Sequence, residues 1–310
     1  MKHKSSCCLF FLIICLTGLL LAACGQTKPK KEEVGLKIVT SFYPIYALTK
    51  IVSGDLNSVK MIQSGQGIHG FEPSANDIAA IYDADVFIYH SHTLESWAGA
   101  LDPNLQGSSV RVLEATEGMV LDKVKGLEDI EAREGMDEST LYDPHTWNDP
   151  LKAAEEAKVI AGQLAKIDPD NASVYQKNAQ QFQDEAKQLV AKYQPQFKKA
   201  KSKHFVTSHT AFSYLAKQFG LEQLGIAGIS TEQEPTSRQL AEIEEFVKAY
   251  QVKTIFVEQG VSPKIAETIA SATGAKIAEL SPLEIDPQNG KTYLENLEKN
   301  LEILVKTLNQ

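Results

Sequence analysis

The sequence predicts an α/β fold with two Rossmann-like lobes, each built on a parallel sheet, joined by one long, rigid linking helix. Three observations predict it. Short apolar strands alternate with helical segments over residues 37–168, a long amphipathic segment occupies residues 169–200, and the alternation restarts over residues 201–310. Such alternation favours parallel sheets covered by helices. With 310 residues, 43% of them hydrophobic, the chain is long enough for about two domains of ordinary size.

Residues 1–23 indicate a signal for export. Lys2 and Lys4 precede an apolar run, residues 7–21, that is shorter than the roughly 20 residues a membrane span needs, and small residues follow it. The ending "LAAC" resembles the bacterial lipobox, in which cleavage precedes the cysteine, here Cys24, and the cysteine is then acylated. The resemblance implies a lipid anchor on the extracellular face of the cytoplasmic membrane. The alternative is an ordinary signal peptide that happens to contain cysteines.

Composition restricts the chemistry of the exported chain. All four cysteines lie at or before Cys24, so the mature protein would contain neither a disulfide nor a thiolate metal ligand. Residues 24–36 are polar and form a predicted tether. Removing residues 1–23 removes two lysines and no acid, which takes the net charge from −9 to −11. No basic cluster is large enough to suggest a nucleic-acid partner.

The first lobe is predicted from alternating strands and helices. Ser74 and Asp77 have the spacing of a capping box, which marks the start of a helix. Near the end of the lobe, Asp149 can cap a helix that Pro150 begins, and apolar residues then recur on one face up to Leu164. The predicted strands cover residues 36–41, 58–63, 85–90 and 110–115, and the predicted helices cover residues 44–54 and 74–84.

The linking helix has the most regular pattern in the chain. From Tyr175 to Phe197, apolar residues follow one another at steps of three or four, which predicts an amphipathic helix over about residues 171–193. Pro195 is expected to end or kink this helix. A helix is a stiff connector, unlike a linker rich in glycine and serine.

The second lobe repeats the alternation. Thr236 and Gln239 have the spacing of a second capping box. A final amphipathic helix is expected to begin at about Lys291. The predicted strands cover residues 204–209, 221–228, 252–258 and 275–280, and the predicted helices cover residues 210–220, 236–251 and 262–274.

Histidine and glutamate side chains gather at the predicted carboxyl ends of strands, where open α/β sheets bind ligands. His145 lies between two Asp-Pro pairs in "LYDPHTWNDP", which favours a rigid, non-helical turn. A lone histidine in a loop is usually only solvated, but the set suggests a site in the cleft between the lobes. Imidazole and carboxylate without thiolate suit a borderline divalent metal. The other candidates are His69, His90, His92, His209, Glu258 and Glu284.

The chain resembles the metal-binding receptor lipoproteins of bacterial ABC importers, the zinc and manganese group known as cluster A-I. Within this group it is most similar to the zinc-binding, laminin-binding lipoproteins of streptococci. The resemblance covers essentially the whole mature chain. It rests on long motifs: "KIVTSFYPIYAL", "GIHGFEPSANDIAAIYDADVFIYHSHTLESWAG", "DPHTWNDP", "TSHTAFSYLAKQFGL", "GIAGISTEQEPTSRQLAEI" and "LSPLEIDPQ".

The resemblance implies a metal held between the lobes by four ligands, His69, His145, His209 and Glu284. It leaves His90, His92 and Glu258 in the cleft wall or behind the ligands. Three imidazoles and one carboxylate form a tetrahedral set that favours zinc, and manganese should bind such a nitrogen-rich site weakly. The ligand set does not discriminate against copper or nickel, which could compete with zinc by affinity. Imidazole protonation should weaken binding below about pH 6.5.

The implied function is capture of zinc for an ABC permease by a monomeric receptor, with laminin binding as a second role that no residue here explains. The alternative is a zinc hydrolase with a three-histidine metal and Glu284 as base, which would need an open coordination position. The enzyme motifs HExxH, GxSxG, Walker A and GxGxxG are all absent from the sequence.

One segment departs from the family pattern. Many zinc members carry a histidine-rich loop before the DPH motif, whereas residues 93–144 contain no histidine here. Residues 126–143 instead hold seven acids and one arginine. This segment is interpreted either as a solvated loop or as a weak electrostatic funnel for cations.

Overall fold

The computed structural model describes residues 35–62, 67–98, 101, 108–125, 127, 129, 141–230 and 234–310. Gly35–Gln310 form one compact unit. The predicted signal, residues 24–34 of the predicted tether with Cys24, and most of the acidic segment 126–143 lie outside the described residues. Among the helices that are described, none is both long and apolar enough to cross a membrane.

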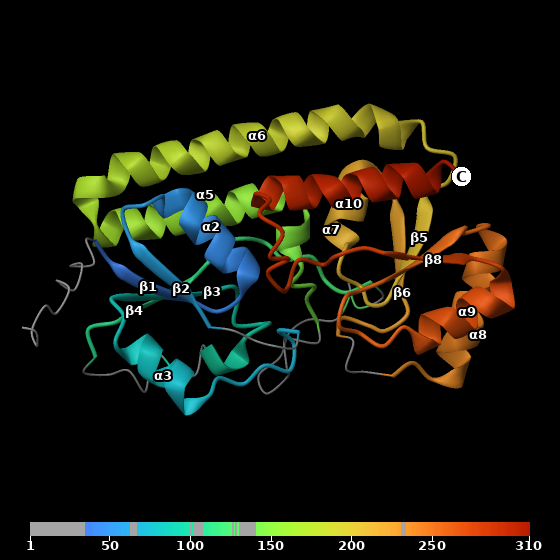
Figure 1. Cartoon of the computed structure of the whole chain (residues 1–310), viewed down its shortest axis with the longest axis horizontal. Coiled ribbons are helices and arrows are strands. Elements are labelled where there is room, and N and C mark those ends of the chain that lie inside the picture. Colours follow the sequence, from blue (N-terminus) through green and yellow to red (C-terminus); the bar gives the residue numbers. More distant parts are fainter. Residues whose placement is uncertain are drawn as a thin grey trace, which may run out of the picture. The chain divides into compact units, whose positions relative to one another are not determined.

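The first lobe contains a four-stranded, fully parallel sheet in the order β2-β1-β3-β4 (Figure 1). Helix α3 begins with the predicted capping box, in which Ser74 and Asp77 bond to each other's backbone N–H. The strands are β1 (Lys37–Thr40), β2 (Ser58–Met61), β3 (Val86–Tyr89) and β4 (Arg111–Glu114), and the helices are α2 (Tyr43–Ser53) and α3 (Ala75–Tyr82).

The second lobe contains another parallel sheet with the equivalent order, β6-β5-β7-β8. Thr236 and Gln239 form the second predicted capping box. The two sheets therefore share one topology, which confirms the predicted fold class. The strands are β5 (His204–Thr207), β6 (Glu222–Gly225), β7 (Thr254–Val257) and β8 (Lys276–Glu279), and the helices are α7 (Ser213–Phe219), α8 (Ser237–Ala249), α9 (Lys264–Thr273) and α10 (Tyr293–Leu308).

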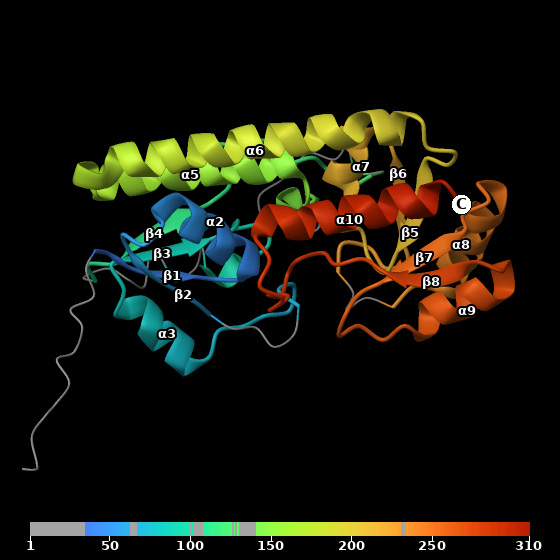
Figure 2. The same ribbon diagram turned by 45° about the horizontal axis from the view of Figure 1, so that its top comes forward.

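One long helix, α6, connects the lobes, and a second, α5, packs along it. Helix α5 (Pro150–Ile167) follows the short helix η2 (Thr146–Asn148), and Asp149 caps it by accepting hydrogen bonds from the N–H groups of Leu151 and Lys152. After the short helix η3 (Pro169–Asn171), α6 (Ala172–Lys198) runs back along α5 and continues to the second lobe (Figures 1 and 2).

Helix α6 is longer than the sequence predicts. It passes through Pro195 and ends at Lys198, so the expected end near residue 193 is wrong. The ring of Phe197 is completely buried and holds the last turn against the core. The ammonium group of Lys203 donates to the carbonyl groups of Phe197 and Lys198, which satisfies acceptors that the helix end leaves free.

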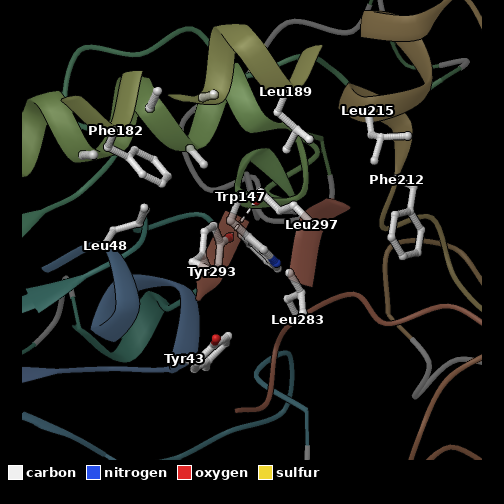
Figure 3. Close-up of a cluster of buried hydrophobic side chains, with 14 of the residues drawn as sticks. Tyr43, Leu48, Trp147, Phe182, Leu189, Phe212, Leu215, Leu283, Tyr293 and Leu297 are labelled. Atoms are coloured by element: carbon white, nitrogen blue, oxygen red, sulfur yellow. Dashed lines mark hydrogen bonds between the residues drawn. The ribbon is translucent and has the colours of Figure 1, made fainter. Parts of the chain in front are cut away.

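The largest apolar cluster draws on both lobes. It joins α2, α5 and α6 to α7 and α10, and Figure 3 shows Trp147 among Tyr293, Leu283 and Leu297 within it. Two smaller clusters belong to one lobe each, around Phe87 in the first and Ile255 in the second. The turn that contains His145 and Trp147 is therefore built into a core that the lobes share.

Candidate metal centre

Four side chains converge where the carboxyl ends of the two sheets meet. His69 follows β2, His145 directly precedes η2, His209 follows β5 and Glu284 follows β8. Each offers one ligand atom, and these atoms all lie within 4.8 Å of one another. His145, His209 and Glu284 are buried and His69 is partly exposed, so the group is nearly closed to solvent.

The spacing of the ligand atoms matches a tetrahedral zinc site. Nε2 of His145 lies 3.1 Å from Nε2 of His69 and 3.3 Å from Nε2 of His209. Oε1 of Glu284 lies 3.2, 3.7 and 3.9 Å from Nε2 of His209, His69 and His145. Zinc bonds of about 2.0–2.1 Å directed to the corners of a tetrahedron give edges of about 3.3–3.4 Å. A zinc ion fits this group with small adjustments.

Two carboxylates behind the histidines fix which ring nitrogen faces the centre. Nδ1 of His145 lies 2.8 Å from Oδ1 of Asp143, and Nδ1 of His209 lies 2.7 Å from Oε1 of Glu258. A carboxylate accepts the Nδ1 proton, so each Nε2 can present a lone pair to the centre. The Nε2 atoms of His145 and His209 lie 3.3 Å apart, so with both Nδ1 atoms protonated their lone pairs repel each other unless a metal ion or a proton lies between them.

The electrostatics of the centre follow from burial and these pairs. Burial lowers the pKa of His145 to about 4 despite its bond to Asp143, so His145 is neutral. Burial also acts to lower the pKa of His209, but the hydrogen bond to Glu258 and the nearby carboxylate of Glu284 outweigh it and raise that pKa to about 10. Burial acts to raise the pKa of Glu284, but His209 and His69 hold it well below its usual range. Without metal, a proton on His209 therefore partly balances the carboxylates.

Glu284 has a buried carboxylate oxygen that is suited to bind a metal ion. Its Oε1 is buried and, within the described chain, accepts no hydrogen bond of good geometry although His209 lies nearby. A buried carboxylate oxygen in this state is costly unless a cation binds it. Gly67 approaches the same carboxylate closely, because a Cβ atom at this position would lie 3.1 Å from Oε2.

Hydrogen bonds join three of the four ligand loops into one frame. Nε1 of Trp147 donates to the carbonyl of Pro282, two residues before Glu284, at 2.8 Å. Nδ2 of Asn148 donates to the carbonyl of Ala211, two residues after His209, at 3.0 Å. The hydroxyl of Ser213 on α7 donates to Asp143. The candidate ligands His145, His209 and Glu284 are thus positioned together across the lobes.

The remaining sequence candidates occupy different places. Glu258 contacts His209 directly. His90 is completely buried and its Nε2 lies 2.9 Å from the hydroxyl of Thr146, so it supports the turn from behind. His92 is bonded to Glu114 at 3.1 Å and lines a separate cavity. Sequence reasoning missed the role of Asp143, although its position two residues before His145 in "DPH" was a usable signal.

Comparison with known proteins agrees with this geometry. Residues 38–307 match the family described as ZnuA, zinc-uptake complex component A, periplasmic. The chain is 39% identical to the high-affinity zinc uptake system protein ZnuA of Bacillus subtilis, over 97% of both chains. It is 36% identical to the zinc-binding lipoprotein AdcA of Streptococcus pneumoniae over 96% of this chain, but it spans only 60% of AdcA.

Two solved structures are similar along most of the chain. A zinc-bound variant of AdcAII from Streptococcus pneumoniae is 66% identical, with a TM-score of 0.84 over 88% of this chain and 98% of that one. The laminin-binding protein Lmb of Streptococcus agalactiae is described as having adhesin and metal transporting activity. It is 60% identical, with a TM-score of 0.81, and the match covers 88% of this chain and 99% of Lmb. The resemblance found in the sequence motifs is confirmed, and the chain belongs to the ZnuA family of zinc-uptake complex components.

Proposed function

We propose that this protein captures one zinc ion outside the cell through His69, His145, His209 and Glu284, and delivers it to an ABC permease. One observation carries the assignment. Three imidazole nitrogens and one carboxylate oxygen lie within 4.8 Å of one another, which a zinc tetrahedron fits with small adjustments, and two further carboxylates hold His145 and His209 in the required tautomer. The relatives named as zinc uptake and zinc-binding proteins support the same ion.

The closed ligand set favours binding over catalysis. Catalytic zinc sites keep a coordination position open for water or substrate, whereas four protein ligands complete the shell of a tetrahedral ion. Glu284 is needed as the fourth ligand, so it is not available as the base of a hydrolase. We therefore propose a receptor that is not an enzyme.

The proposal includes the organisation of the whole chain. Residues 1–23 direct export, Cys24 carries the lipid and residues 24–36 form the tether. Residues 37–168 and 201–310 form the lobes, and residues 169–200 link them. The protein acts as a monomer on the extracellular face of the cytoplasmic membrane. A second role in laminin binding is supported by the description of Lmb as an adhesin, and we assign no residue to it.

Native mass spectrometry of the full chain in detergent, with His209→Ala as the test variant, checks the zinc assignment. We expect one zinc ion per chain, and loss or strong weakening of binding in the variant. His204→Ala is the matched control, because His204 is outside the ligand group and begins β5 at the opposite edge of the sheet. Stoichiometric manganese in place of zinc would overturn the assignment.

A second variant separates the receptor from the hydrolase. Glu284→Ala should lose zinc affinity by orders of magnitude, because the shell loses its only anionic ligand. A variant that retained tight zinc while losing a hydrolytic activity would favour the hydrolase instead.

A further inference from the structure

A second cavity lies at the amino-terminal edge of the second sheet. It has a volume of about 530 Å³ and is lined by the first residues of β5 and β7, by the end of α8 and by the end of α10. The metal ligands His209 and Glu284 instead follow the carboxyl ends of strands. The two sites therefore occupy opposite edges of the same sheet, and the zinc chemistry does not use this cavity.

The charge of this cavity is opposite to that of the molecule. The chain has a net charge of −9, yet four lysines occur within the six residues 198–203. Lys201, Lys203 and Lys253 line the cavity, and its described lining contains no aspartate or glutamate side chain. Glu222 lies at its margin, 3.4 Å from His204.

Most of these lysines are free to bind a ligand. Lys198, Lys199, Lys201 and Lys253 are exposed, and none forms an ion pair with another described residue. Lys203 differs because its ammonium group already caps the carboxyl end of α6. Two of these unpaired ammonium groups, those of Lys201 and Lys253, line the cavity, and on a strongly acidic protein they would concentrate an anion there.

An exposed aromatic ring gives the cavity a second kind of recognition. Tyr250 is 46% exposed, and its ring stacks on the imidazole of His204 with centroids 3.8 Å apart and planes 23° apart. The same ring also contacts Phe246, with centroids 4.6 Å apart, so only its exposed part offers an apolar surface that a sugar ring can cover. Ser202 and Gln251 add hydrogen-bonding groups to the lining.

We propose that this cavity, which we call the lysine–tyrosine site (Lys201, His204, Tyr250 and Lys253), binds a short segment of a sulfated polysaccharide. The ammonium groups contact sulfates, and the ring of Tyr250 packs against a sugar face. The cavity volume falls within the range of small-molecule sites, about 300–1,000 Å³. The cluster is too small for a nucleic acid, whose binding depends on a longer basic surface.

The test measures binding of a heparin-derived hexasaccharide to the full, zinc-loaded chain by isothermal titration calorimetry at low salt. The variant Lys201→Glu/Lys253→Glu should weaken binding by about tenfold or more. The matched control Lys264→Glu/Lys291→Glu makes the same charge change at exposed positions outside the cavity, and should leave the affinity unchanged. Equal losses in the two double variants would show a general effect of net charge and overturn the site.

Two further arms test the chemistry of the ligand. Tyr250→Ala should weaken binding by about tenfold while the salt dependence of the affinity stays the same, because it removes packing and no charge. A hyaluronate hexasaccharide, which carries carboxylates and no sulfate, should bind at least about tenfold more weakly than the heparin fragment. Equal affinity for both fragments, or no binding of either, would overturn the proposal. An unchanged zinc stoichiometry in each variant shows that the protein is folded.

Discussion

At the scale of single residues, the metal centre is governed by the partner of each imidazole. Asp143 and Glu258 have the same geometric role, but they act on histidines in different electrostatic states. Burial keeps His145 neutral, with a pKa of about 4, whereas two carboxylates hold a proton on His209 and raise its pKa to about 10. In the proposed site, zinc would therefore meet a ready ligand in His145 and would have to displace a proton from His209.

This difference predicts proton release on binding. Between about pH 7 and 9, we expect each zinc ion to release about one proton, and the apparent affinity to fall about tenfold for each unit of decreasing pH. Because the pKa of His209 is raised, its protonated form stabilises the metal-free protein. This stabilisation is complete below about pH 6.5 and is lost as the pH rises through about 10. Titration calorimetry in buffers of different ionisation enthalpy counts the released protons. A zinc affinity that does not change between about pH 7 and 9 would contradict the assignment.

The two outer carboxylates should also respond differently to substitution. Asp143→Asn replaces a charged acceptor by a neutral one behind a histidine that is already neutral, so we expect zinc affinity to fall by about 10–100-fold at pH 7. Glu258→Gln makes the same change but also makes the competing proton on His209 easier to displace, so the loss should be smaller. Competition with a zinc chelator measures both. Equal losses would mean that the proton on His209 does not oppose binding.

At the scale of elements, the parts that could be predicted from the sequence are those encoded locally. Strand and helix alternation, both predicted capping boxes and the Asp149 cap need only neighbouring residues, and the structure contains all of them. The end of α6 could not be predicted from Pro195, because the core buries Phe197 and Lys203, after the end of the helix, caps its last carbonyl groups. The histidines were found at strand ends, but the pairing of Asp143 with Ser213 depends on contacts across the lobes.

The loop before His69 gives a prediction at this scale. Gly67→Ala places a Cβ atom 3.1 Å from the carboxylate of Glu284, which must move by a few tenths of an ångström. An overpacking cost of about 1 kcal/mol would weaken zinc binding by about five- to tenfold. Gly228→Ala is the control, since a Cβ atom there meets nothing within 4 Å. If both variants bind zinc like the unmodified protein, Gly67 does not shape the site.

At the scale of the whole molecule, the shared core determines how the lobes behave. Trp147 and its neighbours from α2, α6 and α10 form one apolar cluster, so neither lobe can lose its packing without exposing part of the other. The same turn carries His145, and its backbone and side chains bond to Tyr293 and Pro282 in the second lobe. Metal site and core are thus two parts of one connection between the lobes.

We therefore predict that the described unit unfolds in a single thermal transition, and that zinc shifts all of it. Free zinc at about 100 times the dissociation constant should add about 2.7 kcal/mol to the free energy of unfolding, which raises the midpoint by about 5 °C or more for a chain of this size. Scanning calorimetry with and without zinc measures the shift, and His209→Ala should abolish it while retaining one transition. Two separated transitions, of which zinc moved only one, would show that the lobes unfold independently and that the shared cluster does not couple them.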